Sequence, residues 1–161
     1  MTVLQGPLAD RDSWSAVGHC PIEKTMALVG TRSAMLLMRE AYYGTKRFDD
    51  FARRVGITKA ATSARLSELI EAGLFVKQPY REPGQRSRDE YVLTNAGTEF
   101  MPVVWAMFEW GRRHFDDTPL RLSHLDCGAE ATVEIRCAKG HEVSPDELGV
   151  RLGKRPRPET S

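Results

Sequence analysis

Residues 57–74, with the sequence ITKAATSARLSELIEAGL, form the stretch that decides the predicted fold. Apolar residues recur there at spacings of three and four, which places them on one face of a helix. They are Leu66, Leu69, Ile70 and Leu74. Thr58 precedes this face and can cap the first turn with its hydroxyl, and Gly73 suits the left-handed residue that ends a helix. The stretch therefore predicts a helix over about 58–72.

The two halves of this helix differ in chemistry. Short or cationic side chains, separated by alanines, occupy the first half: Lys59, Thr62, Ser63 and Arg65. A slim polar helix end suits the major groove of DNA, where hydroxyl groups and long cations reach base edges and phosphates. An ordinary amphipathic surface helix would show the same pattern, so the neighbouring segments have to distinguish the two interpretations.

The segment before this stretch predicts three helices. Pro21 suits the first position of a short helix that ends near Gly30, with Cys20 as its N-cap residue and Ile22, Met26 and Val29 facing inward.

The apolar run 34–38 predicts a central buried helix over 31–43, and residues 47–55 form a third, amphipathic helix. Gly56 then turns the chain directly into the helix that follows. A helix, a tight turn and a helix with a polar tip make a helix-turn-helix arrangement.

Two short strands are expected after Gly73, over 74–77 and 90–94. The segment 78–88 between them is rich in proline and arginine, which is typical of a hairpin loop. Beside the polar-tipped helix, this loop is interpreted as a basic wing whose arginines contact phosphates or the minor groove. A flexible solvated loop is the alternative.

Residues 94–115 predict one long helix capped by Thr94, with a kink at Pro102 because proline removes a backbone hydrogen bond. A broad apolar stripe runs along this helix and exceeds what a small winged domain can cover. We therefore infer a homodimer interface built from this helix and the first one. Burial within a single chain is the competing account.

Composition places the chain among globular proteins. Of its 161 residues, 41% are hydrophobic and 28% are charged. No apolar run is long enough to span a bilayer and no signal-peptide pattern opens the chain, so a cytoplasmic protein is expected. Three cysteines fit free or redox-active thiols better than a disulfide framework. Between Lys46 and Arg88, ten Lys or Arg stand against five Asp or Glu, a local excess that indicates a polyanion site or only a solvated face.

Many short motifs lie in register between Cys20 and Gly111. They are Cys20-Pro21-Ile22-Glu23, Gly30, Leu36-Leu37, Arg39-Glu40, Gly44, Arg47-Phe48, Phe51, Ile57-Thr58, Arg65-Leu66, Glu68-Leu69, Gly73-Leu74, Tyr80, Glu90-Tyr91, Leu93-Thr94, Gly97, Pro102-Val103 and Trp110-Gly111. Together they resemble the HxlR family of bacterial winged helix-turn-helix transcription regulators. The resemblance implies a dimer that binds operator DNA through paired recognition helices and wings.

The chain departs from the family at two positions. Ser33 replaces the usual tryptophan and Thr62 the usual bulky aliphatic residue, so the details of base readout are not carried over. The resemblance also implies a role for Cys20, because some relatives sense oxidants or electrophiles through a cysteine at this point. The positive end of a helix favours the reactive thiolate there. A small capping residue without a signalling role is the alternative.

The sequence changes character after Pro119. Residues 120–122 and 132–136 are expected to be strands of a small hairpin. His124, Cys127, Cys137 and His141 form two pairs of zinc-type ligands, although incidental Cys and His on a strand pair are the alternative. Zinc binding stays open, and no metal or cofactor is assigned. The basic, proline-bearing segment from Arg151 onward is expected to be disordered and to add nonspecific affinity for DNA.

The sequence thus predicts a mainly α fold of the α+β class, a winged helix-turn-helix with a long C-terminal dimerisation helix and a small β-rich C-terminal extension. The expected divisions are an N-terminal arm over 1–19, the DNA-binding and dimerisation domain over 20–118, the hairpin extension over 119–148 and the tail over 149–161.

The expected function is that of a homodimeric, sequence-specific DNA-binding transcription regulator, acting as a repressor. Its recognition helix 58–72 would enter the major groove, and its wing 78–88 would lie on the flanking backbone or minor groove. The predicted contacts to double-stranded DNA are Lys46, Arg47, Thr58, Lys59, Thr62, Ser63, Arg65, Arg81, Gln85, Arg86 and Arg88. A winged-helix module that binds an acidic protein partner is the alternative. An enzyme is not expected, because no nucleophile–base pair or open metal site is evident.

Overall fold

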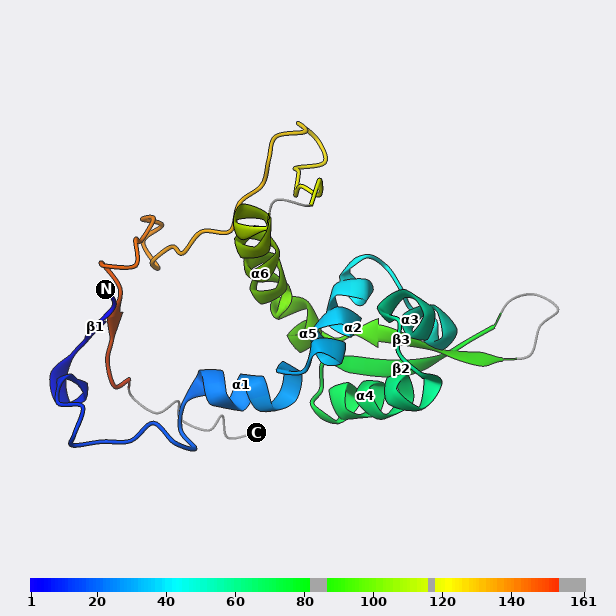
Figure 1. The fold of residues 1–161 in the computed structure, drawn as a ribbon, viewed down its shortest axis with the longest axis horizontal. Helices are drawn as coiled ribbons and strands as arrows, with labels where there is room; N and C mark the ends of the chain where they lie inside the picture. Colours follow the sequence, from blue (N-terminus) through cyan, green and yellow to red (C-terminus); the bar gives the residue numbers. More distant parts are fainter. Residues whose placement is uncertain (82–86, 116–117, 154–161) are drawn as a thin grey trace. The chain divides into compact units, whose positions relative to one another are not determined.

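The computed structural model describes residues 1–81, 87–115 and 118–153. The chain divides into two compact units, one formed by residues 19–133 and the other by residues 1–18 together with the chain from Glu134 onward. The larger unit carries all the predicted DNA-contacting residues, and its ribbon is shown in Figure 1.

Four helices open the larger unit and confirm the predicted order. They are α1 (Pro21–Val29), α2 (Arg32–Tyr42), α3 (Phe48–Val55) and α4 (Lys59–Glu71). Thr31 caps α2 and Thr58 caps α4, in each case with a side-chain oxygen that accepts a backbone N–H three residues on. Gly56 and Gly73 end α3 and α4 in the left-handed conformation, at φ 71° and 74°, which glycine adopts without a steric penalty.

The hydrophobic core is centred on α2. Leu37 and Met38 of α2, Phe51 of α3, and Leu66 and Leu69 of α4 are fully buried and form one cluster. The all-round apolar run 34–38 therefore occupies the centre of the fold, as its sequence predicts. Helix α1 differs from its prediction. Only Val29 is buried, while Ile22 and Met26 are 73% and 56% exposed instead of facing inward.

A two-stranded antiparallel hairpin follows α4, with β2 (Phe75–Tyr80) paired to β3 (Arg88–Leu93) from Phe75↔Leu93 to Tyr80↔Arg88. Both strands extend into the segment predicted as loop. Pro79 is tolerated within β2 because this sheet has only two strands, so the missing N–H of the proline is not needed to pair with a third strand. In Figure 1, α3 and α4 flank this hairpin.

The predicted long helix is two helices, α5 (Asn95–Glu99) and α6 (Met101–His114). Pro102 lies in the first turn of α6, where the missing N–H has no intrahelical partner to lose. The proline therefore begins a new helix instead of kinking a continuous one.

The start of α5 is fastened to the end of α4. The Thr94 hydroxyl donates to the Gly73 carbonyl at 2.5 Å and accepts from the Gly97 N–H at 3.1 Å. A Cβ at Gly97 would overlap the backbone oxygen of Leu74, so only glycine allows this approach. The Tyr42 hydroxyl donates to the Gly97 carbonyl at 2.6 Å, and burial raises the pKa of Tyr42 to about 12, so the donor stays protonated.

The predicted strands at 120–122 and 132–136 are absent from the described chain. Isolated bridges at Ser123↔Glu130 and Arg136↔Glu142 occur instead. In the smaller unit, β1 (Val3–Leu4) pairs in parallel with β4 (Gly149–Val150), and a 3-10 helix, η1, covers Gly6–Ala9. The N-terminal arm thus takes part in a pairing that no local pattern signals.

No helix in the described parts of the chain has the length and apolar character needed to cross a membrane.

Two glycine substitutions test the packing of α5 and α6. Gly97→Ala should lower the free energy of unfolding by about 1–3 kcal/mol, because the new methyl group meets backbone that cannot move aside. Gly111→Ala in α6 is the matched control. Its methyl group would meet only the Phe115 ring, at 3.7 Å, so it should raise stability by up to about 1 kcal/mol. Urea denaturation measures both, and equal effects would contradict the described contact.

Candidate nucleic-acid interface

The N-terminal half of α4 presents small and polar side chains to solvent. Thr58, Lys59 and Ser63 are exposed, as are the alanines between them. The C-terminal half is anchored by Leu66 and Leu69, both fully buried. One end of this helix is therefore fixed in the core, while the other is free of bulky groups and can approach a groove closely.

Thr62 corrects the predicted groove face. Its side chain is fully buried, and its hydroxyl donates to the Thr58 carbonyl at 2.9 Å. A residue with no accessible surface cannot contact a base, so Thr62 belongs to the core. The Thr58 hydroxyl is also engaged, as the cap that accepts the Ala61 N–H at 3.1 Å.

The cations of α4 lie beside carboxylates. Lys59 Nζ is 2.6 Å from an Asp49 carboxylate oxygen of α3, and Arg65 pairs with Glu68 one turn along α4. The Lys59 side chain is 75% exposed, so it can exchange its partner for a phosphate at small cost. The pairing of Asp49 with Lys59 has no local sequence signal, because the two residues are ten positions apart and lie on different helices.

A polar groove of about 290 Å³ lies beside the loop end of the hairpin strands, between these strands and the α2–α3 turn. Lys46, Arg47, Tyr80 and Glu90 are among its lining residues. The Arg47 guanidinium donates to the Tyr80 hydroxyl at 2.9 Å, and its carbon lies 5.0 Å from the centre of the Tyr80 ring. Tyr80 thus orients a predicted phosphate contact, a role that sequence reasoning did not assign.

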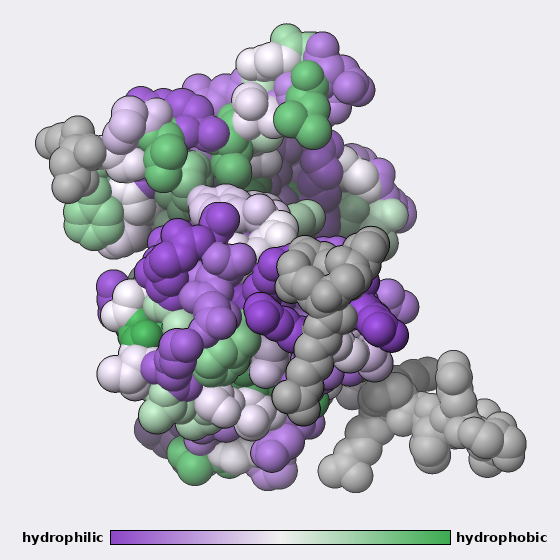
Figure 2. Space-filling view, turned by 90° about the vertical axis from the view of Figure 1, so that its right-hand side faces the viewer, coloured by the Kyte–Doolittle hydropathy of each residue, from purple (hydrophilic) through white to green (hydrophobic). Residues whose placement is uncertain are grey.

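The hairpin itself carries exposed basic residues. Arg81 follows β2 and Arg88 begins β3, and both are exposed. Lys77 pairs with Asp89 across the strands at 2.8 Å, and its hydrogen bond to Asp89 raises the pKa of Lys77. Gln85 and Arg86 lie outside the described residues. Figure 2 faces the hairpin end of Figure 1 and shows hydrophilic residues gathered there.

The cysteines are all free thiols. Cys20 is the N-cap residue of α1 and is half-buried, but its side chain makes no capping hydrogen bond. His124 Nδ1 and Cys127 Sγ are 3.3 Å apart. Within residues 1–81, 87–115 and 118–153, no three His, Cys, Asp or Glu side chains are grouped so that they could hold a metal ion.

The geometry described so far is that of a winged helix: a helix-turn-helix, an antiparallel hairpin and a polar helix tip beside basic strands. Residues 28–119 match the family model described as HxlR-like helix-turn-helix. The chain belongs to the HxlR-like helix-turn-helix family.

Curated relatives of this HxlR-like protein are described as uncharacterized HTH-type transcriptional regulators. One from Mycobacterium tuberculosis is 34% identical over 127 residues, which cover 76% of this chain and 79% of the relative. Another, YdeP of Bacillus subtilis, is 28% identical over 117 residues, which cover 72% of this chain and 87% of the relative. The family and these relatives are transcription regulators and not enzymes.

Solved structures show the same winged-helix architecture. The crystal structure of PA1607, a proposed transcription factor, has a TM-score of 0.73 and 28% identity, over 86% of this chain and 97% of that one. The redox regulator HypR in its reduced form has a TM-score of 0.54 and 31% identity, over 60% of this chain and 95% of that one. The mixed, mostly helical α+β fold predicted from the sequence is thereby confirmed.

Adjacent substitutions on α4 test which face is buried. Thr62→Glu should lower the free energy of unfolding by about 2 kcal/mol or more, because it forces a charge into the core. Ser63→Glu, the matched control at an exposed position, should change it by no more than about 0.5 kcal/mol. Chemical denaturation compares the two, and a stable Thr62→Glu protein would show that α4 is rotated from its described orientation.

Proposed function

We propose that this HxlR-like protein is a homodimeric, sequence-specific DNA-binding repressor. Helix α4 enters the major groove, and the β2–β3 hairpin lies along the flanking backbone or minor groove. The observation that supports this most directly is the division of α4 into a buried half and an exposed half of small polar residues. A dimer bound in this way at a promoter represses by occupying it.

The proposed DNA contacts fall into two groups. Lys59 and Ser63 face the groove, with Thr58 at the helix tip, and are placed to reach base edges. Lys46, Arg47, Arg81 and Arg88 flank them and supply phosphate contacts that carry no sequence information, and Arg65 adds a further cation on α4.

The proposed dimer uses the apolar surfaces of α1 and α6. Ile22 and Met26 of α1 are 73% and 56% exposed, and Val103 and Trp110 of α6 are 45% and 58% exposed. Large apolar side chains on two helices of one unit exceed what an isolated soluble domain usually exposes. The same surfaces of a second copy would bury these apolar side chains on both helices. The two-fold axis of such a dimer would direct one α4 helix at each of two half-sites in the DNA.

Cys20 is proposed as a thiol that couples oxidation to DNA binding. It occupies the N-cap position of α1, one of the two proposed dimer helices, and its side chain is partly buried. Oxidation or alkylation of the sulfur at this point would alter how α1 packs on the partner copy and hence the spacing of the recognition helices. The similarity to HypR supports this proposal by analogy.

The Lys59 contact is tested by binding to duplex DNA from upstream of the protein's own gene, over a salt series. If the Lys59 side chain reaches a base, Lys59→Ala should weaken specific binding by about 1–3 kcal/mol. If the side chain contacts a phosphate instead, its removal should reduce the salt slope of the binding constant by about 1. Lys139→Ala, which removes an exposed lysine of the smaller unit, is the matched control and should bind as the parent does.

Equal binding by both lysine variants would refute the placement of Lys59. A shallow salt dependence in the parent protein would instead favour an acidic protein partner, because counterion release makes DNA binding steeply salt-dependent.

The dimer is tested by sedimentation of Ile22→Glu and Trp110→Glu. Each substitution places a charge on an exposed apolar surface, so it should produce monomers while leaving the unfolding transition of the monomer unit nearly unchanged. Lys24→Glu changes the charge of an exposed residue on α1 and serves as the control. A parent protein that sediments as a monomer at micromolar concentration would refute the proposal.

The thiol proposal predicts that diamide changes DNA binding of the parent protein and that Cys20→Ser abolishes this response. Cys127→Ser retains Cys20 and should respond as the parent does. Electrophoretic mobility shifts under reducing and oxidising conditions measure the effect. A response that persists in Cys20→Ser would assign sensing to another thiol.

A further inference from the structure

A second concave site lies in the larger unit, away from the polar tip of α4. It is a cavity of about 440 Å³ between the C-terminal end of α2, the C-terminal half of α6 and residues 118–120. Its walls are mostly apolar. They include Tyr43, Met107, Phe108, Gly111, Phe115 and Leu120. The volume lies within the range of small-molecule sites, which typically combine apolar walls with a few polar groups.

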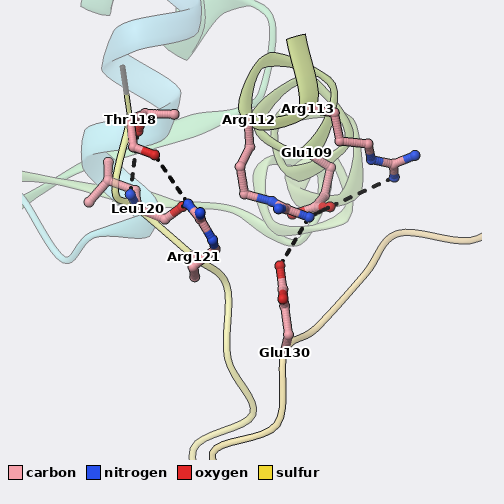
Figure 3. Close-up of polar contacts among 7 residues, drawn as sticks. All are labelled: Glu109, Arg112, Arg113, Thr118, Leu120, Arg121 and Glu130. Carbon is pink, nitrogen blue, oxygen red and sulfur yellow. Dashed lines mark hydrogen bonds and ion pairs between the residues drawn. The ribbon is translucent and has the colours of Figure 1, made fainter. Parts of the chain in front are cut away.

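Two arginines line this cavity, and both pair with carboxylates, Arg112 with Glu109 and Glu130, and Arg39 with Glu40. Arg112 donates from Nε and Nη2 to the two carboxylate oxygens of Glu109, at 3.2 and 3.1 Å, and Nη2 is also 3.0 Å from a Glu130 oxygen. Figure 3 shows Arg112 between these two carboxylates. Glu109 is only 2% exposed, and its hydrogen bond from Arg112 lowers the pKa of this carboxyl group. Arg112 therefore has no need of a further anion.

Arg39 differs from Arg112. Its Nη2 donates to Glu40 at 2.7 Å, but its Nε is buried and has no hydrogen-bond partner in the described parts of the chain. A buried donor without a partner costs free energy that a suitable acceptor would recover. A carboxylate matches the fork of donors that a guanidinium presents.

We propose that this cavity binds a small amphipathic carboxylate, with an aromatic or aliphatic body against the apolar walls and its carboxylate on Arg39. Arg39 provides the donor for the carboxylate, because among the described residues it has a single carboxylate partner and an unpaired Nε, whereas Arg112 is held by both Glu109 and Glu130.

The Arg39 partner links the cavity to the DNA-binding helices. Glu40 is 5% exposed and accepts the Thr45 hydroxyl at 3.3 Å, and it lies 4.0 Å from Arg54 of α3. A ligand carboxylate competes with Glu40 for Arg39, which weakens the support of the turn between α2 and α3. Ligand binding therefore lowers DNA affinity, and this coupling rests on the proposed function.

The test uses the full chain and calorimetry with 2-naphthoate and octanoate as probes, and 2-naphthalenemethanol as the neutral counterpart. At least one carboxylate should bind, and the alcohol should bind at least tenfold more weakly. Arg39→Gln should weaken carboxylate binding at least tenfold. Arg113→Gln, an exposed arginine of α6 that does not line the cavity, is the matched control.

Gly111→Leu fills the cavity from α6 and should also weaken binding at least tenfold. The Cβ of a substituent there meets only the Phe115 side chain and the rest of the leucine enters the open cavity, so this variant should fold even if Arg39→Gln does not. Failure of both carboxylates to bind the parent protein, or equal binding by Gly111→Leu, would overturn the site. The site would also be overturned if the parent protein is a dimer and the Gly111→Leu variant is a monomer. That result would mean that a second copy of the chain covers the cavity.

DNA affinity is measured separately, with and without the bound carboxylate. A loss of affinity in the parent, and none in Gly111→Leu, supports the coupling through Glu40. Carboxylate binding without any change in DNA affinity would remove the coupling and leave the binding site standing. Absence of DNA binding in every state would count against the proposed function and not against the cavity.

Discussion

The winged fold of this HxlR-like protein depends on the side chain of Thr94. Its hydroxyl joins the carbonyl of Gly73, where α4 ends, to the N–H of Gly97 in α5. The Thr94 N–H adds a bond to the Leu74 carbonyl at 3.1 Å. These contacts hold the end of α4, the end of β3 and the start of α5 at one point. The direction in which α6 leaves the domain is thereby tied to the direction in which α4 points. Since α6 is a proposed dimer helix, this junction would set how two recognition helices are spaced.

Much of the positive charge near α4 and the hairpin is held by carboxylates of the same chain. Lys59 with Asp49, Arg65 with Glu68 and Lys77 with Asp89 are each exposed or half-exposed pairs. Such pairs contribute little to stability, so exchanging a carboxylate for a phosphate costs little. The carboxylates nevertheless reduce the charge that a passing polyanion meets. In the proposed DNA complex, binding would depend on a close fit that displaces several carboxylates together, and this would favour specific sites over random duplex.

The helices and the two-stranded wing could be predicted from the sequence, because periodicity, caps and glycines are local signals. Thr58 and Thr94 cap helices as predicted, and Gly56 and Gly73 end helices. The sequence-based predictions were wrong or incomplete where contacts with other parts of the chain determine the position of a residue. Thr62 looks polar in sequence, but it bonds to its own helix and fills the core. Likewise, β1 pairs with β4 across more than a hundred residues, which no short window contains. The Asp49–Lys59 pair and the stacking of Arg47 on Tyr80 were missed for the same reason.

The exposed half of α4 also bears on how such a protein diverges after gene duplication. Ala60, Ala61 and Ala64 reach solvent, and none of them belongs to the buried cluster around Leu37 and Leu66. Substitutions at these alanines therefore meet little resistance from folding, since exposed positions away from caps and cores change stability only slightly. A duplicated copy can acquire new side chains there one at a time while every intermediate still folds. The anchoring of one half of the helix thus leaves the other half free to evolve.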